Sequence, residues 1–249
     1  MSYLLHEAIA ESHSEMKKID VCLTPELLNL HNIENSIVVV VDIFRATSCM
    51  TTAFANGVEA IIPVATLDEC ISYQRQGYLA AAERDGKTPE GSDFDNSPCS
   101  YTTEKVHGST ICVTTTNGTL AITKSKSAVK VMIGSFLNLG ALASYLRNQQ
   151  YDVLILCAGW KGKPNLEDTL FAGALVERLN NEFMVEEDAA LMAQRLYALG
   201  KDDLLAFVAS SSHVKRLQRL GIQKDIAYCL QHDLYDVLPV LRGNSLVKM

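Results

Sequence analysis

Residues 36–42 read Ser-Ile-Val-Val-Val-Val-Asp, an unbroken apolar run that ends in a carboxylate. A run of β-branched residues without polar alternation is typical of a strand buried on both faces, as in a parallel sheet covered by helices. Residues 47–56 follow with helical spacing, and Gly57 ends that segment as a helix-terminating glycine. This strand-then-helix unit predicts an α/β fold.

The same unit recurs on both sides of this stretch. Apolar runs and helical spacing predict further strands at 18–22, 60–64, 78–82, 109–114, 129–133 and 152–158, and helices at 67–75, 137–147 and 166–180. Such alternation favours a three-layer α/β/α architecture with a largely parallel sheet. After residue 186 the pattern is helical, at 189–199, 202–209, 211–220 and 223–231. Two final runs, 236–241 and 245–248, predict a terminal hairpin and a sheet that is mixed at one edge.

The chain of 249 residues contains no linker-like, low-complexity or repeated segment. We therefore expect a polar N-terminal extension at residues 1–16, followed by a single domain at residues 17–249. Residues 83–107 are rich in Gly, Pro, Asp, Asn and Ser and lack periodicity. A loop of this length in a compact domain is usually functional, so we expect it to lie over the site.

The composition excludes several classes of protein. With 22 Lys and Arg against 29 Asp and Glu, the net charge is −7, and no basic stripe with interleaved aromatic residues favours a nucleic-acid partner. No apolar run is long enough to cross a bilayer and no secretory signal opens the sequence, so we expect a cytoplasmic protein. Seven cysteines without a Cys-x-x-Cys pair predict neither disulfides nor a zinc site. A homodimer is a reasonable expectation for an enzyme of this size.

Polar residues gather where the predicted strands end. They fall at Asp42, at residues 83–84, at residues 114–118, at residues 134–135 and at residues 158–159. In open α/β sheets a ligand binds beyond the carboxyl ends of the strands, where loops and helix N-termini converge. These separated clusters are therefore expected to meet in one crevice.

The first clusters combine carboxylates with guanidinium groups. Asp42 can hold a divalent cation or attack phosphorus, Arg45 can clamp phosphoryl oxygens, and Thr47 and Ser48 open the following helix with two hydroxyls. The pair Glu83 and Arg84 repeats this composition, and Mg²⁺ favours one or two carboxylates. A helix cap and a solvated turn are the ordinary structural explanations of the same residues.

The later clusters supply hydroxyls, amides and further acids. The remaining candidates for substrate binding are Asn96, Ser97, Thr115, Thr116, Asn117, Gly118, Ser135 and Gly159, and two further candidate metal ligands are Glu167 and Asp168. Loop chemistry, an Asn-Gly turn and acids capping a helix remain alternatives for these positions. The sequence contains no Walker loop, no dinucleotide-binding Gly-x-Gly-x-x-Gly, and none of the serine-hydrolase or zinc-hydrolase signatures.

Taken together, these motifs resemble one family, the 2-phosphosulfolactate phosphatases. The resemblance is carried in order by DIFRATS at 42–48, AAERDG at 81–86, DFDNSP at 93–98, TTTNGT at 114–119, GSFLN at 134–138, CAGWKG at 157–162 and NLEDTLFAG at 165–173, and it continues through 211–241. It covers residues 18–241. Each motif alone is weak, but their combination in this order is specific.

The resemblance implies Mg²⁺-dependent hydrolysis of (2R)-2-phospho-3-sulfolactate to 3-sulfolactate and phosphate, a step associated with coenzyme M formation or sulfonate metabolism. A small anionic phosphorylated substrate agrees with the residues. Asp42, Glu83 and Glu167 or Asp168 would hold Mg²⁺, and the catalytic set would be Asp42, Arg45 and Arg84, with both arginines facing anionic oxygens. Thr115, Thr116 and Asn117 would donate hydrogen bonds to the remaining oxygens.

Two questions stay open at the level of sequence. The nucleophile is either a metal-activated water or Asp42 itself, and the absence of an Asp-x-Asp motif after the strand favours water. The function could instead be that of a phosphatase or phosphotransferase acting on another small phosphorylated hydroxy acid, of a lyase on a related acid, or of an anion-binding regulator without turnover.

Overall fold

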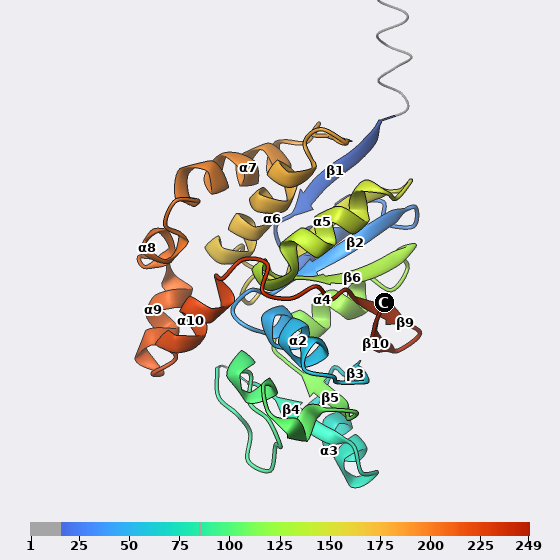
Figure 1. Ribbon diagram of the computed structural model, residues 1–249, viewed down its shortest axis with the longest axis vertical. Helices are drawn as coiled ribbons and strands as arrows, with labels where there is room; N and C mark the ends of the chain where they lie inside the picture. Colours follow the sequence, from blue (N-terminus) through green and yellow to red (C-terminus); the bar gives the residue numbers. More distant parts are fainter. Residues whose placement is uncertain (1–15, 85) are drawn as a thin grey trace, which may run out of the picture.

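The computed structural model describes residues 16–84 and 86–249. Its strands form a ten-stranded sheet in the order β4-β5-β3-β10-β9-β6-β2-β7-β1-β8 (Figure 1). The strands are β1 Lys17–Cys22, β2 Ser36–Val41, β3 Ala60–Pro63, β4 Leu79–Ala82, β5 Thr110–Thr114, β6 Lys130–Gly134, β7 Asp152–Cys157, β8 Phe183–Met184, β9 Pro239–Arg242 and β10 Ser245–Lys248. The predicted extension at residues 1–16 lies outside the described residues except for Met16. The single domain at 17–249 stays a prediction.

Nine α-helices accompany this sheet in the described residues. They are α2 Ala46–Ala55, α3 Leu67–Arg75, α4 Gly118–Lys124, α5 Leu139–Arg147, α6 Leu166–Leu179, α7 Asp188–Gly200, α8 Leu204–Val208, α9 Ser212–Arg219 and α10 Gln223–Cys229. Short 3₁₀ helices are η1 Pro25–Leu30, η2 Pro98–Tyr101, η3 Glu104–Val106 and η4 Phe136–Asn138. None of these described helices is long and apolar enough to cross a membrane. The cytoplasmic location and the homodimer stay predictions.

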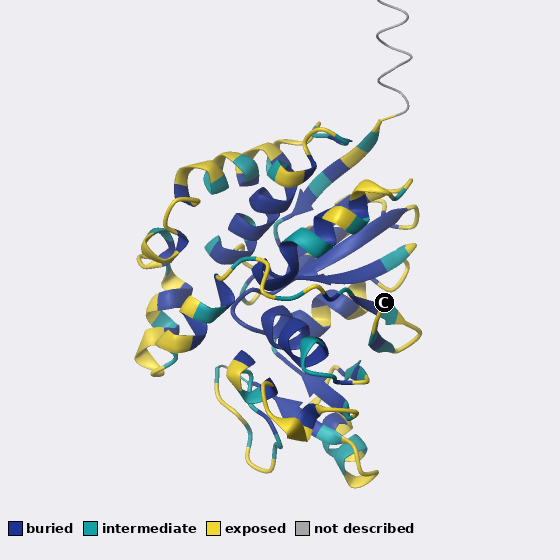
Figure 2. Cartoon of the chain, in the orientation of Figure 1, coloured by how far each residue is buried: buried dark blue, intermediate teal, exposed yellow. Residues whose placement is uncertain are grey.

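Alternation along β2 explains the layers. Every residue of β2 is buried (Figure 2). Val39 and Val41 belong to an apolar cluster with residues of α5, α6 and α7, whereas Val38 and Val40 belong to a second cluster with residues of α2 and α4. Because successive side chains of a strand point to opposite faces, helices cover both faces of the sheet. The predicted three-layer α/β/α class is confirmed.

The terminal hairpin lies inside the sheet, and its predicted place at an edge is wrong. β9 pairs antiparallel with β6 through Val240, and β10 pairs antiparallel with β3 through Leu246 and Val247. β1, β7, β2 and β6 are mutually parallel, as are β3, β5 and β4. Each strand of a hairpin has one free edge for backbone hydrogen bonds, so a hairpin can lie between two sets of mutually parallel strands. The sequence pattern does not reveal this strand order. The two-residue strand β8 is too short to leave a pattern.

The C-terminal helices lie beside the ends of several strands. In Figure 1, α8, α9 and α10 form a column next to the arrowhead of β2 and the start of α2. Val214 and Leu217 of α9 and Ile226 of α10 belong to the same apolar cluster as Val41. This packing places α9 and α10 where the polar loops after β2 and β7 emerge.

Candidate active site

A narrow cavity collects residues from six separate parts of the chain. It is lined by Asp42, Phe44, Arg45, Glu83, Gly86, Asn96, Asn117, Trp160, Arg216 and Leu217. The structure therefore brings together the predicted site residues Asp42, Arg45, Glu83, Asn96 and Asn117. The lining residues that were not predicted from the sequence are Phe44, Gly86, Trp160, Arg216 and Leu217.

Asp42 lies between the N-termini of two helices. The Thr47 hydroxyl donates to the Asp42 carbonyl oxygen at 3.0 Å and accepts from the Asp42 N–H, which fixes the end of β2. A Cβ atom on Gly118, the first residue of α4, would lie 3.0 Å from Asp42 Oδ2 and 2.8 Å from the Ala46 Cβ. The glycine thus allows α4 to approach α2 closely around the carboxylate.

The Asp42 carboxyl group has a pKa raised to about 6. Burial is the main cause, and the negative charges of Glu83 and Glu167 add to it. Burial and neighbouring carboxylates both disfavour the ionised form. The ionised form of Asp42 is therefore less stable in the cavity than in water, and a cation at this carboxylate would stabilise it.

Glu83 follows β4 and is held by two loops. Its Oε1 accepts from the Gly86 N–H, and its Oε2 accepts from the Thr116 N–H at 3.2 Å. The Thr116 hydroxyl also contacts this carboxylate. Thr116 therefore positions Glu83, and the tight turn at Gly86 has a φ of 82°, which favours glycine.

Arg84, a predicted catalytic residue, makes hydrogen bonds at the ends of β4 and β5. Its guanidinium donates to the Glu83 carbonyl oxygen at 2.7 Å and to the Thr114 hydroxyl at 2.7 Å. Arg84 is not among the residues that line the cavity. Its contacts instead tie the loop after β4 to the end of β5.

Arg45 is buried in an ion pair with Asp225 of α10. Its Nη1 contacts Asp225 Oδ2, and the two residues are 5% and 7% exposed. Asp225 Oδ1 accepts from the Ser97 hydroxyl at 2.8 Å. The pair thereby anchors the loop that presents Asn96, and Ser97 supports the cavity without lining it.

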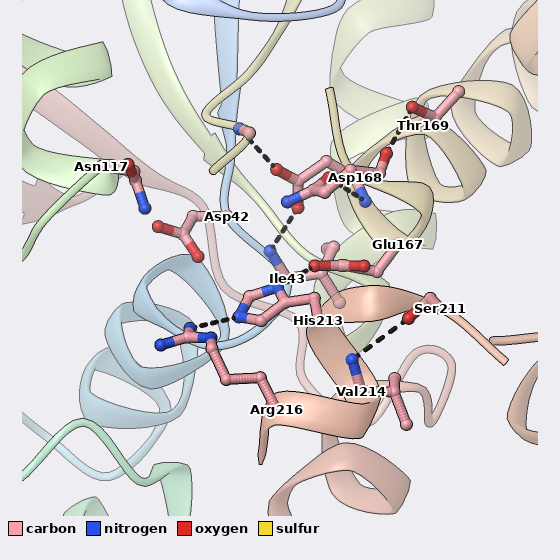
Figure 3. Close-up of polar contacts among 12 residues, drawn as sticks. Asp42, Ile43, Asn117, Glu167, Asp168, Thr169, Ser211, His213, Val214 and Arg216 are labelled. Carbon is pink, nitrogen blue, oxygen red and sulfur yellow. Dashed lines mark hydrogen bonds and ion pairs between the residues drawn. The ribbon is translucent and has the colours of Figure 1, made fainter. Parts of the chain in front are cut away.

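Asp168 joins the ends of two strands. Its Oδ1 accepts from the Ile43 N–H at 2.8 Å and its Oδ2 accepts from the Gly159 N–H at 3.0 Å (Figure 3). Burial raises the pKa of this carboxyl well above its usual range. Both oxygens are therefore engaged in holding the loops after β2 and β7, and neither Asp168 nor Gly159 lines the cavity.

Glu167 is fully buried and contacts a histidine that the sequence did not single out. Its Oε1 contacts His213 Nδ1, and its Oε2 has no hydrogen-bond partner among the described residues. His213 and Arg216 lie one turn apart on α9, on the same side of that helix. The spacing of a histidine and an arginine three residues apart was the available signal, but it does not reveal which helix face meets the cavity.

The other predicted hydroxyl groups support loops. Ser48 donates to the Ile43 carbonyl oxygen, Ser135 to the Thr51 hydroxyl, and Thr115 Oγ1 accepts from the Thr119 N–H. Ser48, Thr115 and Ser135, like Thr47, are buried and do not line the cavity. The contacts of these four residues are thus with the protein itself.

The described residues contain no complete set of protein ligands for a metal ion. Among them, no three His, Cys, Asp or Glu side chains converge as a metal-binding group. Asp42 and Glu83 are the carboxylates that line the cavity. This donor set fits Mg²⁺, which is commonly held by one or two carboxylates while waters and substrate oxygens complete its shell.

Known proteins resemble this chain over most of its length. A model of the 2-phosphosulpholactate phosphatase family matches residues 22–244. A protein of Thermotoga petrophila named "Probable 2-phosphosulfolactate phosphatase" is 39% identical over 223 residues, which are 90% of this chain and 95% of the relative. Proteins with the same name from Caldanaerobacter subterraneus and Gloeobacter violaceus are 39% and 38% identical, over 89% of this chain and 93% and 94% of their own lengths. The chain belongs to the 2-phosphosulfolactate phosphatase family.

Proposed function

We propose that the protein is a Mg²⁺-dependent phosphoric monoester hydrolase that converts 2-phospho-3-sulfolactate and water to 3-sulfolactate and phosphate. The names of its relatives support the substrate. The observation that supports phosphate-ester hydrolysis is that Asp42, Arg45 and Glu83 line one cavity. Asp42 and Arg45 lie between β2 and α2, whereas Glu83 follows β4. A carboxylate pair beside a guanidinium suits a cation and a phosphoryl group together.

Binding of the phosphoryl group falls to the donors that line the cavity. Arg45 lines it while its Nη1 is held by Asp225, so its guanidinium is fixed before substrate arrives. The side-chain amides of Asn96 and Asn117 add neutral donors. Fixed donors aimed at developing charge need no reorganisation during the reaction, which is how such sites stabilise a transition state.

Asp42 and Glu83 are the proposed ligands of Mg²⁺. Asp42 is the better placed of the two, because Glu83 already accepts hydrogen bonds from Gly86 and Thr116. When bound, the ion would neutralise negative charge on the phosphoryl oxygens. Glu167 and Asp168 hold other parts of the site, and their predicted role as ligands stays a prediction.

Hydrolysis forms a bond from a nucleophilic oxygen to phosphorus and breaks the ester P–O bond. The electron pair of that bond passes to the ester oxygen, which takes up a proton and leaves as the hydroxyl of sulfolactate. Arg45 stabilises charge on the equatorial oxygens throughout this exchange. Hydrolysis of a substrate whose phosphorus is made chiral with oxygen isotopes distinguishes direct attack by water from attack by Asp42, since one displacement inverts the configuration at phosphorus and two successive displacements retain it.

The test is phosphate release by the purified protein with Mg²⁺ or with a chelator. We expect release from 2-phospho-3-sulfolactate in Mg²⁺, and slower release from 2-phospholactate and phosphoglycerate. Asp42→Asn removes charge at nearly constant shape and should lower kcat by about 10²- to 10³-fold. Glu59→Gln, at an exposed carboxyl beside β3, is the matched control and should keep wild-type turnover. Equal release with and without Mg²⁺, or wild-type turnover by Asp42→Asn, would refute the proposal.

A further inference from the structure

Three side chains contact one another in series, from the interior of the protein to the cavity. Glu167 Oε1 contacts His213 Nδ1, and His213 Nε2 lies 2.8 Å from Arg216 Nη2 (Figure 3). Glu167 is fully buried and His213 is 8% exposed, whereas Arg216 lines the cavity with Asp42 and Arg45. We refer to Glu167, His213 and Arg216 as the relay.

The chemistry of the relay assigns the protons of His213. A guanidinium has only donors, so His213 Nε2 must accept from Arg216. The ring proton therefore lies on Nδ1, where it is donated to the Glu167 carboxylate. As in other carboxylate–histidine pairs, the buried acid selects the tautomer and fixes the direction of the second nitrogen.

Aromatic packing holds both members of the relay that lie on α9. The His213 ring stacks on Trp160 with centroids 5.6 Å apart and meets Phe44 edge-on at 6.1 Å. The Arg216 guanidinium carbon lies 3.7 Å from the centroid of the Trp160 ring. This is the geometry of a cation–π contact, which is favourable when the cation is shielded from water.

The opposite wall leaves little room for Arg216 to move. A Cβ atom on Gly86 would lie 3.2 Å from Arg216 Nη1 and 2.8 Å from a methyl carbon of Leu220. The turn after β4 thus approaches α9 closely across the cavity. Arg216 is therefore held by a ring face, by a fixed acceptor and by a neighbouring turn.

We propose that the relay positions Arg216 as the residue that recognises the non-reacting anionic end of the substrate, its sulfonate or its carboxylate. This inference rests on the proposed function, in which Arg45 and Asp42 serve the phosphoryl group. The neutral imidazole separates Glu167 from the guanidinium by one ring, so the acid orients Arg216 without sharing its hydrogen bonds. A fixed, planar guanidinium is suited to bind two oxygens of a carboxylate or sulfonate at once. Arg216 is thereby a specificity-determining residue, and Glu167 and His213 are positioning residues.

The experiment compares esters that share the phosphate and differ in the rest. The set is 2-phospho-3-sulfolactate, 2-phospholactate, which lacks the sulfonate, 2-phosphopropane-1-sulfonate, which lacks the carboxylate, and p-nitrophenyl phosphate, which lacks both. Arg216→Gln should raise KM about 10- to 100-fold for esters carrying the recognised anion, with kcat changed less than threefold. Arg216→Gln should leave the KM for p-nitrophenyl phosphate unchanged. Comparison of the two analogues that carry one anionic group besides the phosphate identifies which anion is bound.

Matched variants separate recognition from folding. Arg219→Gln removes an exposed arginine of the same helix and should leave every KM unchanged. Arg216→Lys keeps the charge but not the planar fork and should recover only part of the loss. Glu167→Gln should raise the same KM values by a smaller factor, and ¹⁵N NMR of the wild-type protein should show the His213 proton on Nδ1, because a proton on Nε2 would contradict the relay.

The outcomes distinguish this inference from the proposed function. Equal losses on all four esters with Arg216→Gln, or no loss on any, would overturn the role of Arg216. Binding of 3-sulfolactate by calorimetry needs no turnover and should weaken by a similar factor in Arg216→Gln. If wild-type protein bound 3-sulfolactate through Arg216 but released no phosphate, the proposed function would fail while the relay's role would stand.

Discussion

Asp42 illustrates how a single functional residue lowers the stability of the fold. Its pKa rises from 3.8 to about 6 because the carboxyl is buried. The folded state therefore binds the proton more tightly than the unfolded state, and stability falls as pH rises from about 4 to 6. Above pH 6 the cost is constant and amounts to about 3 kcal/mol, since one pKa unit corresponds to about 1.4 kcal/mol.

Asp42→Asn should therefore stabilise the metal-free protein at pH 7.5 by up to about 3 kcal/mol while lowering kcat by about 10²- to 10³-fold. The gain should shrink below pH 4, where Asp42 is protonated in both states. Urea unfolding of both proteins in a chelator at pH 7.5 and pH 4 measures the difference. A variant less stable than wild type at pH 7.5 would contradict this account of the carboxyl.

Removing one partner of the Arg45–Asp225 ion pair should lower both stability and turnover, unlike Asp42→Asn, which gains stability. Arg45→Met leaves the Asp225 carboxylate buried without its guanidinium partner, which should cost about 3–5 kcal/mol. Arg45→Met/Asp225→Asn removes the orphaned charge and should recover most of that stability, yet turnover should stay lost in both proteins. Urea unfolding and phosphate release measure the two effects. A double variant as unstable as the single one would show that the buried charge is not the cause.

Residues at strand ends could be predicted, and residues brought by packing could not. Asp42, Glu83 and Asn117 follow apolar runs that are visible in the sequence, so their place at the ends of strands was apparent. Arg216 lies on a helix whose position depends on how α9 packs against the core. Periodicity shows that a helix exists, but it does not show which cavity one of its faces will border.

At the scale of elements, the ion pair between His31 and Asp20 ties the end of η1 to β1. The His31 Nδ1 lies 3.0 Å from Asp20 Oδ2, and this partner raises the pKa of His31 to about 10. Below pH 6.5 both folded and unfolded states carry the proton, so the pair contributes fully. As pH rises towards 10, the unfolded state has lost the proton while the folded state still holds it, and the contribution disappears.

The free energy of unfolding of His31→Gln should therefore differ most from that of wild type at pH 6, and the difference should approach zero at pH 10. Denaturant unfolding at pH 6, 8 and 10 measures it. Asp20→Asn removes the other partner and should reproduce the same trend. A difference that does not change with pH would show that His31 contributes by packing alone.

Most elements were predictable because continuous apolar runs mark the strands and apolar residues at helical spacing mark the helices. The helix predicted at 67–75 has the bounds of α3, whose capping box at Thr66 and Glu69 leaves a local signature. The hairpin was predicted, but its neighbours were not, because strand order depends on contacts between segments far apart in sequence. Leu246, for example, pairs with Ile61.

At the scale of the whole molecule, the joint formed by that hairpin, β9 and β10, lies between two sets of mutually parallel strands and hydrogen-bonds to both. Leu246 of β10 is fully buried, whereas Leu199 of α7 is 78% exposed. Leu246→Ala should lower the free energy of unfolding by about 2–5 kcal/mol, and Leu199→Ala should change it by less than about 0.5 kcal/mol. Urea unfolding of both variants tests the contrast. Equal, small effects would mean that the joint contributes little to stability.

The central position of β9 and β10 also bears on how the protein is made. Residues 239–248 follow every other strand of the sheet in the chain, so a ribosome polymerises both halves before the segment that unites them exists. During that interval the nascent chain presents the unpaired rims of β3 and β6, which are surfaces that invite association with other chains. Both rims are covered only when the hairpin enters the gap, where β9 pairs with β6 and β10 pairs with β3.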